Sequence, residues 1–442
     1  MSRILLACIA VVFALASVQR AQGLEVEADL DVFPTASLAQ EGGGQSMQVE
    51  ATRIVAQSAI SHKQALGEGL TLSGTAWLDA DSLPSESPLA VPATKLDMNA
   101  RLLEFGLEWE ALPGALILDL GKKIIHPSSG FFKTPLNMLS RPAVGDVPSS
   151  TAASVGKWEE GWVGADLTWL AGNFSIANFF SPRLAWSQGA DQVLQYISQQ
   201  QSEYDDLLRL GYRIGEADLR LLALTSADSI GGADSDFHLQ AGAGLDVNLG
   251  DSLTVRAEAS AADSTDRLYV VDATRMTSGT ESVAWAPRAL LGFTWAEGGA
   301  KDLSVMAEYY YNGLGFVGSD YDRLMQYSGN SLAAAGPSVA GGRSVAGGQG
   351  VADVLDQYGS FEAARHYGFA RVAGNIEDDL AAQLWVVTNL QDLSCMTGAV
   401  LTYTRDAWAI SGALVDAWGG SNTEEGLSPL LWRLDLELSL FF

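Results

Sequence analysis

The feature that most constrains the fold is a period of two in the placement of apolar residues. In the last segment, 432–442, apolar residues occupy every second position, and charged or hydroxyl residues fill most of the gaps. A β-strand directs successive side chains to opposite faces, so this segment has one apolar face and one largely charged face. The pattern predicts a strand with one face in an apolar environment and the other face in an aqueous one.

The clearest hairpin lies at 237–262, where apolar residues alternate with polar or glycine residues along both arms. Gly250 and Asp251 form a two-residue tight-turn signal between the arms. Each arm has about the ~9–11 residues with which a tilted strand crosses a bilayer. The period of two over both arms excludes a helix.

Similar segments recur along the chain and predict an all-β fold. Their spacing indicates roughly 14–18 antiparallel strands in a single transmembrane β-barrel over residues 24–442, with sixteen or eighteen favoured. Segment 24–33 repeats the alternation of the last strand. An open sheet edge in lipid would leave backbone groups unsatisfied, so we expect the N-terminal and C-terminal strands to pair and close the barrel.

Residues 1–23 have the three parts of a secretory signal peptide. Arg3 provides a basic start, an apolar run covers 4–16, and a polar stretch follows with small residues at Ala21 and Gly23. After residue 23, no apolar run approaches the ~18–20 residues that a membrane helix needs. The sequence therefore predicts export, with the membrane crossed by strands.

Charge and cysteine content exclude several classes of protein. The formal net charge is −27, which argues against a general nucleic-acid binder because such proteins carry a basic surface. Cys8 falls within the expected signal peptide, so Cys395 has no partner for an intramolecular disulfide. We expect Cys395 to be packed or to face lipid.

Two segments without strand periodicity predict long loops. The first, at about 126–160, contains four prolines, and the second, at about 312–360, is rich in Gly, Ser and Ala. Loops of this length are usually functional or disordered. In a barrel, such a loop can fold inward and narrow the pore.

These features together resemble the porin-like outer-membrane β-barrels of Gram-negative and other double-membraned bacteria. A terminal aromatic residue preceded by alternating apolar residues resembles the signal that the barrel assembly machinery reads. The positions that match this assembly signal are Leu434, Leu436, Leu438, Leu440 and Phe442. The resemblance implies an outer-membrane location, contact with lipid, the assembly machinery as a partner during insertion, and homo-trimer formation as one possible assembly.

The polar faces of the expected strands supply candidates for the lining of the lumen. They are Glu25, Glu27, Asp29, Glu108, Asp119, Asp166, Arg209, Arg213, Arg220, Asp246, Arg256, Glu258, Glu308, Arg433, Asp435 and Glu437. Acids outnumber bases in this set, which favours cations. The sequence predicts a channel for passive diffusion of small hydrophilic solutes with a weak cation preference.

Other functions remain open at this point. A non-transport barrel, either an adhesin or a structural surface protein, would use the two long loops, and a channel for hydrophobic substrates is a further alternative. The four histidines have no recognisable catalytic context, and no metal or phosphate-binding motif stands out. We therefore expect no enzymatic activity, catalytic residues, cofactor or metal.

Overall fold

The computed structural model describes residues 25–41, 44–83, 95–139, 161–182, 204–230, 234–263, 265–272, 277–299, 302–335, 363–405, 408–420, 423–424 and 432–440. In this part of the chain, eighteen strands form one sheet, two further strands form a separate hairpin, and one helix is present. The all-β class and the upper end of the expected strand number are confirmed. The expected signal peptide at 1–23 lies outside the described residues.

The main sheet runs through the whole chain. Its strands are β1 (Glu25–Glu41), β2 (Gly44–Gly67), β3 (Leu70–Leu83), β4 (Lys95–Leu112), β5 (Leu116–Lys123), β6 (Trp162–Ala171), β7 (Phe174–Ser181), β8 (Tyr204–Ile214), β9 (Ala217–Ile230), β10 (Asp234–Leu249), β11 (Leu253–Ala262), β14 (Ala286–Ala296), β15 (Ser304–Asn312), β16 (His366–Glu377), β17 (Leu380–Asn389), β18 (Cys395–Arg405), β19 (Trp408–Trp418) and β20 (Trp432–Leu440).

Each strand of the sheet pairs antiparallel with the next one along the chain. The one interruption comes after β11, which pairs with β14. The intervening strands, β12 (Thr265–Asp272) and β13 (Thr277–Val283), pair only with each other. The result is an up-and-down meander.

Most connections at one end of the sheet are short, and the longest ones are at the other end, although two or three residues also join β1 to β2 and β9 to β10 there. Two or three residues join β2 to β3, β4 to β5, β6 to β7, β8 to β9, β10 to β11, and β16 to β17. Gly114 and Gly250 stand in two of these turns with φ of 68° and 71°, a conformation that glycine adopts without steric cost. The longest connections, 124–161 and 313–365, are at the opposite end, and β1 begins and β20 ends at the short-turn end.

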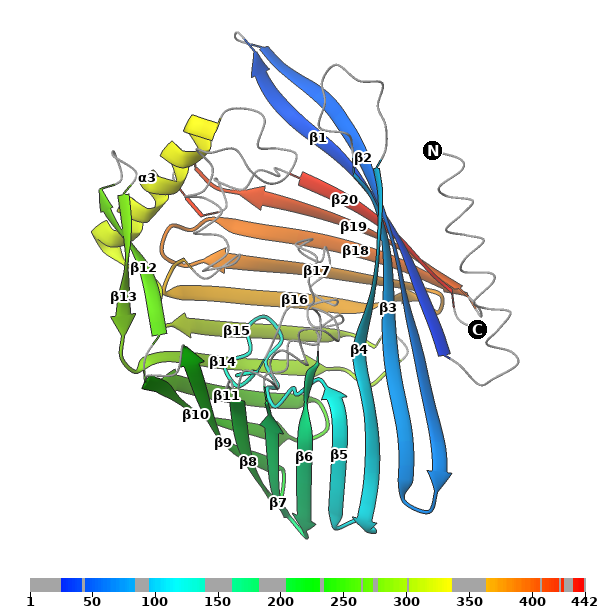
Figure 1. Cartoon of the computed structure of the whole chain (residues 1–442). Coiled ribbons are helices and arrows are strands. Elements are labelled where there is room, and N and C mark those ends of the chain that lie inside the picture. Colours follow the sequence, from blue (N-terminus) through cyan, green and yellow to red (C-terminus); the bar gives the residue numbers. More distant parts are fainter. Residues whose placement is uncertain are drawn as a thin grey trace.

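The sheet curls so that its first and last strands, β1 and β20, lie side by side (Figure 1). Closure of the barrel requires these two strands to be adjacent in this way. Among the strand pairings that the structure describes, no hydrogen-bonded ladder joins these two strands. Closure of the barrel through such a ladder therefore stays a prediction.

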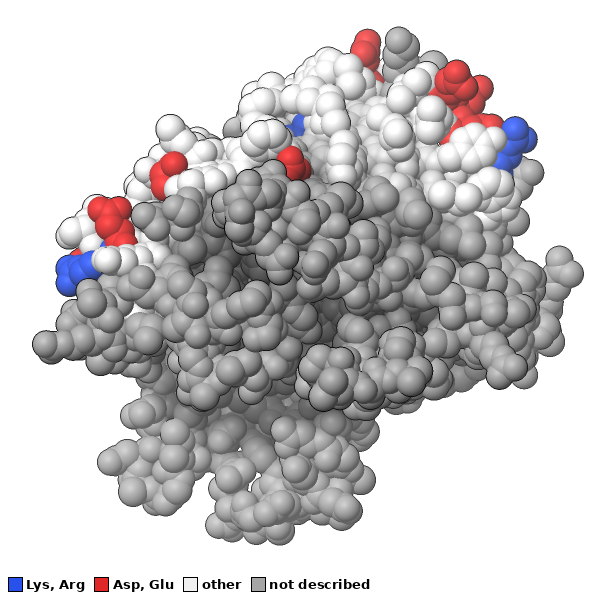
Figure 2. All heavy atoms as spheres, turned by 90° about the horizontal axis from the view of Figure 1, so that it is seen from above, with Lys and Arg blue, Asp and Glu red and all other residues white. Residues whose placement is uncertain are grey.

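The outward face of the sheet is apolar. On β17, β18 and β19, the side chains of Leu384, Leu401 and Leu414 are 61%, 53% and 49% exposed. Trp109 and Trp169, near the short-turn ends of β4 and β6, are similarly exposed. Seen from above, the described surface is mostly uncharged, and its charged side chains stand in separate places (Figure 2). An apolar outward face is stable in contact with hydrocarbon, and aromatic residues near strand ends are typical of a bilayer interface.

The connection between β15 and β16 contains helix α3 (Gly318–Ala335), inside a segment whose Gly/Ser/Ala-rich composition suggested a loop. Its Tyr321, Leu324 and Met325 are buried in a cluster with Tyr367 and Phe369 of β16. In Figure 1 the helix, in yellow, lies beside the β12–β13 hairpin. Among the described residues, the structure has no helix long and apolar enough to span a membrane.

Candidate functional site: the lumen and the inner loop

Residues 124–139, called the inner loop below, follow β5 and lie inside the curve of the sheet, where Figure 1 shows them in cyan. Their contacts run from the neighbouring β6 and β7 across β9, β10 and β11 to β15 and β16. The described half of the first expected long loop therefore folds inward. Residues 140–160 lie outside the described residues.

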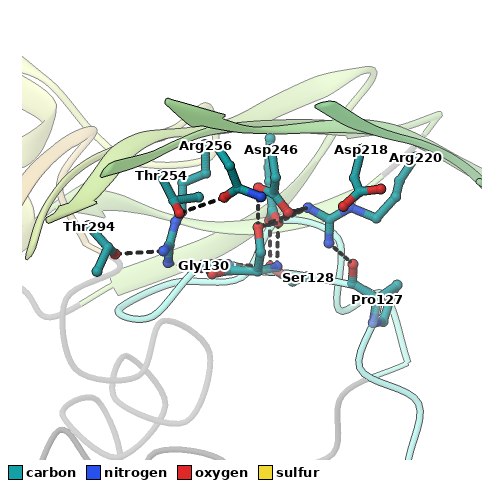
Figure 3. Close-up of polar contacts among 12 residues, drawn as sticks. Pro127, Ser128, Gly130, Asp218, Arg220, Asp246, Thr254, Arg256 and Thr294 are labelled. Carbon is teal, nitrogen blue, oxygen red and sulfur yellow. Dashed lines mark hydrogen bonds and ion pairs between the residues drawn. The ribbon is translucent and has the colours of Figure 1, made fainter. Parts of the chain in front are cut away.

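The middle of the inner loop is held by a network of charged side chains from three adjacent strands. The backbone N–H of Ser129 donates to Glu258 at 2.6 Å, and its hydroxyl donates to Asp246 at 2.7 Å. Arg220 pairs with Asp246 at 2.7 Å and donates to the Ser129 hydroxyl at 2.8 Å. Figure 3 shows Arg220, Asp246 and Arg256 pointing from the sheet toward the loop. Glu258 has no exposed side-chain surface, so these donors replace the water that its carboxylate would otherwise bind.

The tip of the inner loop is held by a second buried carboxylate, Glu308 of β15. It accepts hydrogen bonds from the backbone N–H groups of Phe131 and Phe132 at 2.9 and 2.8 Å. Arg256 lies 3.4 Å from the same carboxylate and also donates to the carbonyl of Ser129 at 2.6 Å. The side chain of Glu308 is fully enclosed. Charged groups on the wall therefore fix the backbone of the loop as well as its side chains.

Aromatic contacts close the side of the lumen next to α3. The rings of Phe131 and Phe132 stack on Phe369 at 5.4 and 5.7 Å between centroids. The guanidinium of Arg371 lies 5.1 Å from the Phe131 ring, a cation–π geometry. Together with the buried residues of α3, these rings fill the space against β15, β16 and β17. Among the described residues, this part of the interior is an apolar, aromatic-rich core.

On the opposite side of the lumen, described residues of β2 to β7 line a hollow. The hollow has a volume of about 420 Å³. Its lining residues are Lys63, Ser73, Gly74, Thr75, Glu104, Gly106, Glu108, Asp119, Leu120, Gly121, Lys122, Lys123, Gly164, Asp166 and Phe179. Most of these residues are charged, hydroxylated or glycine, so the wall of the hollow is polar.

An ion-pair chain stabilises one margin of this hollow. Lys123 pairs with Asp119 on its own strand and with Asp166 on β6 at 3.1 Å. Arg209 of β8 pairs with the other oxygen of Asp166, whose side chain is 1% exposed. A buried carboxylate needs such partners, because an unpaired charge in this position would be strongly unfavourable.

Most sequence-predicted lumen residues with described side chains meet on the inner face. Asp119, Asp166, Arg209, Arg220, Asp246, Arg256, Glu258 and Glu308 form the contacts above, and Glu108 lines the hollow. Arg213 is different, because it pairs at 2.7 Å with Asp218 near the short turn and is 66% exposed, away from the inner loop.

For the terminal strands, the structure gives backbone positions only. Glu25, Glu27 and Asp29 lie in β1, and Arg433, Asp435 and Glu437 lie in β20, with side chains outside the described residues. Of the expected assembly signal, Leu434, Leu436, Leu438 and Leu440 lie in β20. Phe442 is outside the described residues. Their roles stay predictions.

Sequence reasoning missed the loop residues that meet these charges, above all Ser129, Phe131 and Phe132. No local pattern marks them, because their charged partners are 91 or more residues away in the sequence. It also missed Lys123, which a simple signal could have identified. Lys123 stands four residues after Asp119 on the same face of β5, where a basic residue can neutralise its acidic neighbour.

A third polar cluster joins connections at the long-loop end. Glu424, between β19 and β20, accepts hydrogen bonds from the hydroxyl of Tyr367 at 2.9 Å and the amide of Asn389 at 2.9 Å. The backbone N–H of Glu424 donates to Asp392 at 3.0 Å, and the hydroxyl of Tyr321 of α3 donates to the same Asp392 oxygen. This mouth cluster ties α3, the β17–β18 turn and the β19–β20 connection together.

The mouth cluster is expected to loosen as pH rises toward neutrality. Burial, together with the nearby Asp392, raises the pKa of Glu424 to about 7, against the hydrogen bonds from Tyr367, Ala363 and Asn389 that lower it. An unfolded Glu titrates near ~4.3, so the stabilisation is complete below that pH and is lost as pH rises through the folded pKa. Hydrogen exchange of 389–394, corrected for intrinsic rates, should therefore increase between pH ~4.3 and about 7. The Glu424→Gln variant should show no such increase, and an unchanged increase in this variant would contradict the assignment.

No protein-family profile matches the chain, and no curated protein matches it. Solved structures similar to the computed one include a mutant of the Rh. blastica porin, with 10% identity and a TM-score of 0.42, over 95% of this chain and 99% of that chain. Another is Salmonella typhi OmpF in complex with daunomycin, with 10% identity and a TM-score of 0.45, over 95% of this chain and 97% of that chain. At these values we base the functional argument on the geometry of the chain alone.

Proposed function

We propose that the protein is a porin-like channel of the bacterial outer membrane, through which small hydrophilic solutes diffuse passively. The observation that carries this proposal is the inner loop, which buried carboxylates hold across a charged inner face, while the outer face of the same sheet is apolar. A sheet with these two faces suits lipid outside and water inside. The inner loop and the α3 side restrict the lumen to the side along β2 to β7.

We propose a weak cation preference for this pore. The hollow along β2 to β7 is lined by Glu104, Glu108, Asp119 and Asp166, against three lysines. The chain as a whole has a formal net charge of −27. An excess of acidic groups lowers the electrostatic energy of a cation in the pore and raises that of an anion. The lysines keep the preference small.

The same proposal covers location and assembly. Residues 1–23 direct export, β20 with its alternating leucines engages the barrel assembly machinery, and the exposed leucines of the sheet contact membrane lipid. Association into a homo-trimer would cover part of this apolar face. No nucleic acid is involved, and no chemical step is assigned to the protein.

Two measurements on the purified protein in lipid vesicles and planar bilayers test the proposal. Swelling of vesicles in sugars of graded size should show rapid entry of small sugars and exclusion of large ones. In a salt gradient, the reversal potential should indicate a modest preference for K⁺ over Cl⁻. Anion preference would overturn the assigned selectivity. Vesicles that contain folded protein but admit no sugar would favour an adhesive or structural role.

A further inference from the structure

We propose that the hollow in the lumen along β2 to β7 is a recognition site for a small dipolar solute that carries both an ammonium and a carboxylate group, of the size of an amino acid or dipeptide. Lys63 at one margin would bind the carboxylate, and Glu108 at the other would bind the ammonium. The inference rests on the proposed channel function and adds the class of solute that this channel favours.

The floor of the hollow is made of backbone. Gly106 of β4, Gly121 of β5 and Gly164 of β6 stand side by side in register, so no side chain projects from this row. Gly121 has φ of +142°, and a Cβ atom there would lie 2.0 Å from the carbonyl oxygen of Phe105. The structure thus excludes larger residues at the centre of the floor and leaves space above it.

The acidic margin runs parallel to this floor, two residues nearer the short turns. Glu108, Asp119 and Asp166 are aligned across β4, β5 and β6. Lys123 and Arg209 neutralise the two aspartates. Glu108 makes no ion pair or hydrogen bond within the part of the chain that the structure describes. Its carboxylate is therefore available to a cationic group in the hollow.

The basic margin lies on β3 and β2, in the same row across the strands as the three glycines. Ser73 is opposite Gly106, and Lys63 is opposite Ser73. Lys63 is exposed and, among the described residues, has no ion-pair partner. Its ammonium and the hydroxyl of Ser73 both line the hollow, and together they suit a carboxylate.

The spacing of the two margins favours a solute with separated charges of opposite sign. Lys63 is on β2 and Glu108 is on β4, and strands two places apart are about 10 Å distant. The volume of about 420 Å³ lies within the range of ~300–1,000 Å³ typical of ligand sites. A simple cation would use only Glu108, a simple anion would use only Lys63, and an uncharged sugar would use neither charge.

The test compares three probes of similar size that differ in charge. Glycylglycine carries both charges, glycylglycine amide carries only the ammonium, and N-acetylglycylglycine carries only the carboxylate. Entry of labelled probes is measured in vesicles that contain the full-length protein, held at zero membrane potential. In the wild type, glycylglycine should enter fastest.

The variants separate the two contacts. Glu108→Gln should slow glycylglycine and its amide about threefold and leave the acetylated probe unchanged, the size expected for a partly exposed charge pair. Lys63→Gln should slow glycylglycine and the acetylated probe and leave the amide unchanged. Glu297→Gln, at an exposed position on the β14–β15 turn, is the matched control and should change nothing.

A space-filling variant gives an independent measurement. A Cβ atom at Gly106 would lie 3.5 Å from the Leu120 carbonyl oxygen, an ordinary contact, so Gly106→Val should fold and fill the hollow. It should slow all three probes. The recognition site would be wrong if Glu108→Gln and Lys63→Gln each slowed all three probes equally, or slowed none of them. This holds even if ions and sugars pass through the channel normally. If folded wild-type protein admitted no probe, ion or sugar, the proposed channel itself would be wrong.

Discussion

Replacement of Glu308 by alanine is expected to destabilise the folded protein by about 3–5 kcal/mol, the cost of breaking a buried charge network by removing one partner. Glu308 accepts hydrogen bonds from the backbone of Phe131 and Phe132 and lies 3.4 Å from Arg256. Its loss leaves the two partly buried backbone N–H groups without their acceptor and removes the countercharge of the Arg256 guanidinium. The tip of the inner loop should then detach from β15, and the pore should widen.

Urea unfolding in lipid vesicles measures this stability change, and single-channel recording measures the pore. Glu308→Gln is the matched control, because the amide keeps the size and one acceptor oxygen. It should cost less, about 1–2 kcal/mol, as expected when a charged acceptor becomes a neutral one. The alanine variant should also show larger and noisier current steps than the wild type. An alanine variant with wild-type stability and current would show that Glu308 does not hold the inner loop.

Gly121→Ala is expected to prevent most of the protein from reaching its folded form. The added methyl group would lie 2.0 Å from the Phe105 carbonyl oxygen and 2.7 Å from the Cα atom of Gly106, both backbone atoms of the paired strand. The φ of +142° is also unfavourable for alanine. Together these effects should cost about 3 kcal/mol or more.

The fraction of heat-modifiable, folded protein on unboiled gels measures this outcome. Gly106→Ala is the control, since it changes the neighbouring glycine of the same row, where the nearest atom is 3.5 Å from the added carbon. It should fold like the wild type. Normal folding of Gly121→Ala would mean that the backbone of β5 is not held in the conformation that opens the hollow.

The sheet could be predicted well from the sequence because each strand has one apolar face and one polar face. The hairpin expected at 237–262 corresponds to β10 and β11, and its turn at 250–252 is one residue longer than the two-residue turn that the Gly-Asp signal predicted. An apolar outward face and a polar inward face impose a period of two on every strand, and this pattern can be recognised without knowledge of the neighbouring strands. The polar face of each strand could therefore be identified one strand at a time.

Structure inside the long connections could not be predicted in this way. Helix α3 lies in a Gly/Ser/Ala-rich segment. It buries Tyr321 and Leu324 in a cluster with residues of β16, so its apolar side chains follow no pattern set by lipid. The β12–β13 hairpin is short and lacks clear alternation, so it was not expected. Helix α3 packs against β16 and contacts β12, so both elements depend on tertiary contacts that no local periodicity reveals.

The inner loop illustrates the same limit at the functional site. The pattern marked Glu258 and Glu308 as inward-facing, yet their partners, Ser129, Phe131 and Phe132, belong to a proline-containing segment without periodicity. Trp162 shows a related ambiguity. It stands at the start of β6, and aromatic residues near strand ends are typical of a membrane interface, but its indole N–H donates to the carbonyl of Leu139 in the inner loop. An aromatic residue at a strand end does not by itself show which face it occupies.

Single-channel recording in planar bilayers tests the central claim most directly. The purified wild-type protein, shown to be folded by its heat-modifiable migration, is added to one side of the membrane. A lumen narrowed but not closed by the inner loop predicts discrete, stable current steps that increase linearly with salt concentration. Folded protein that inserts into the bilayer and produces no current steps at any salt concentration would contradict the account.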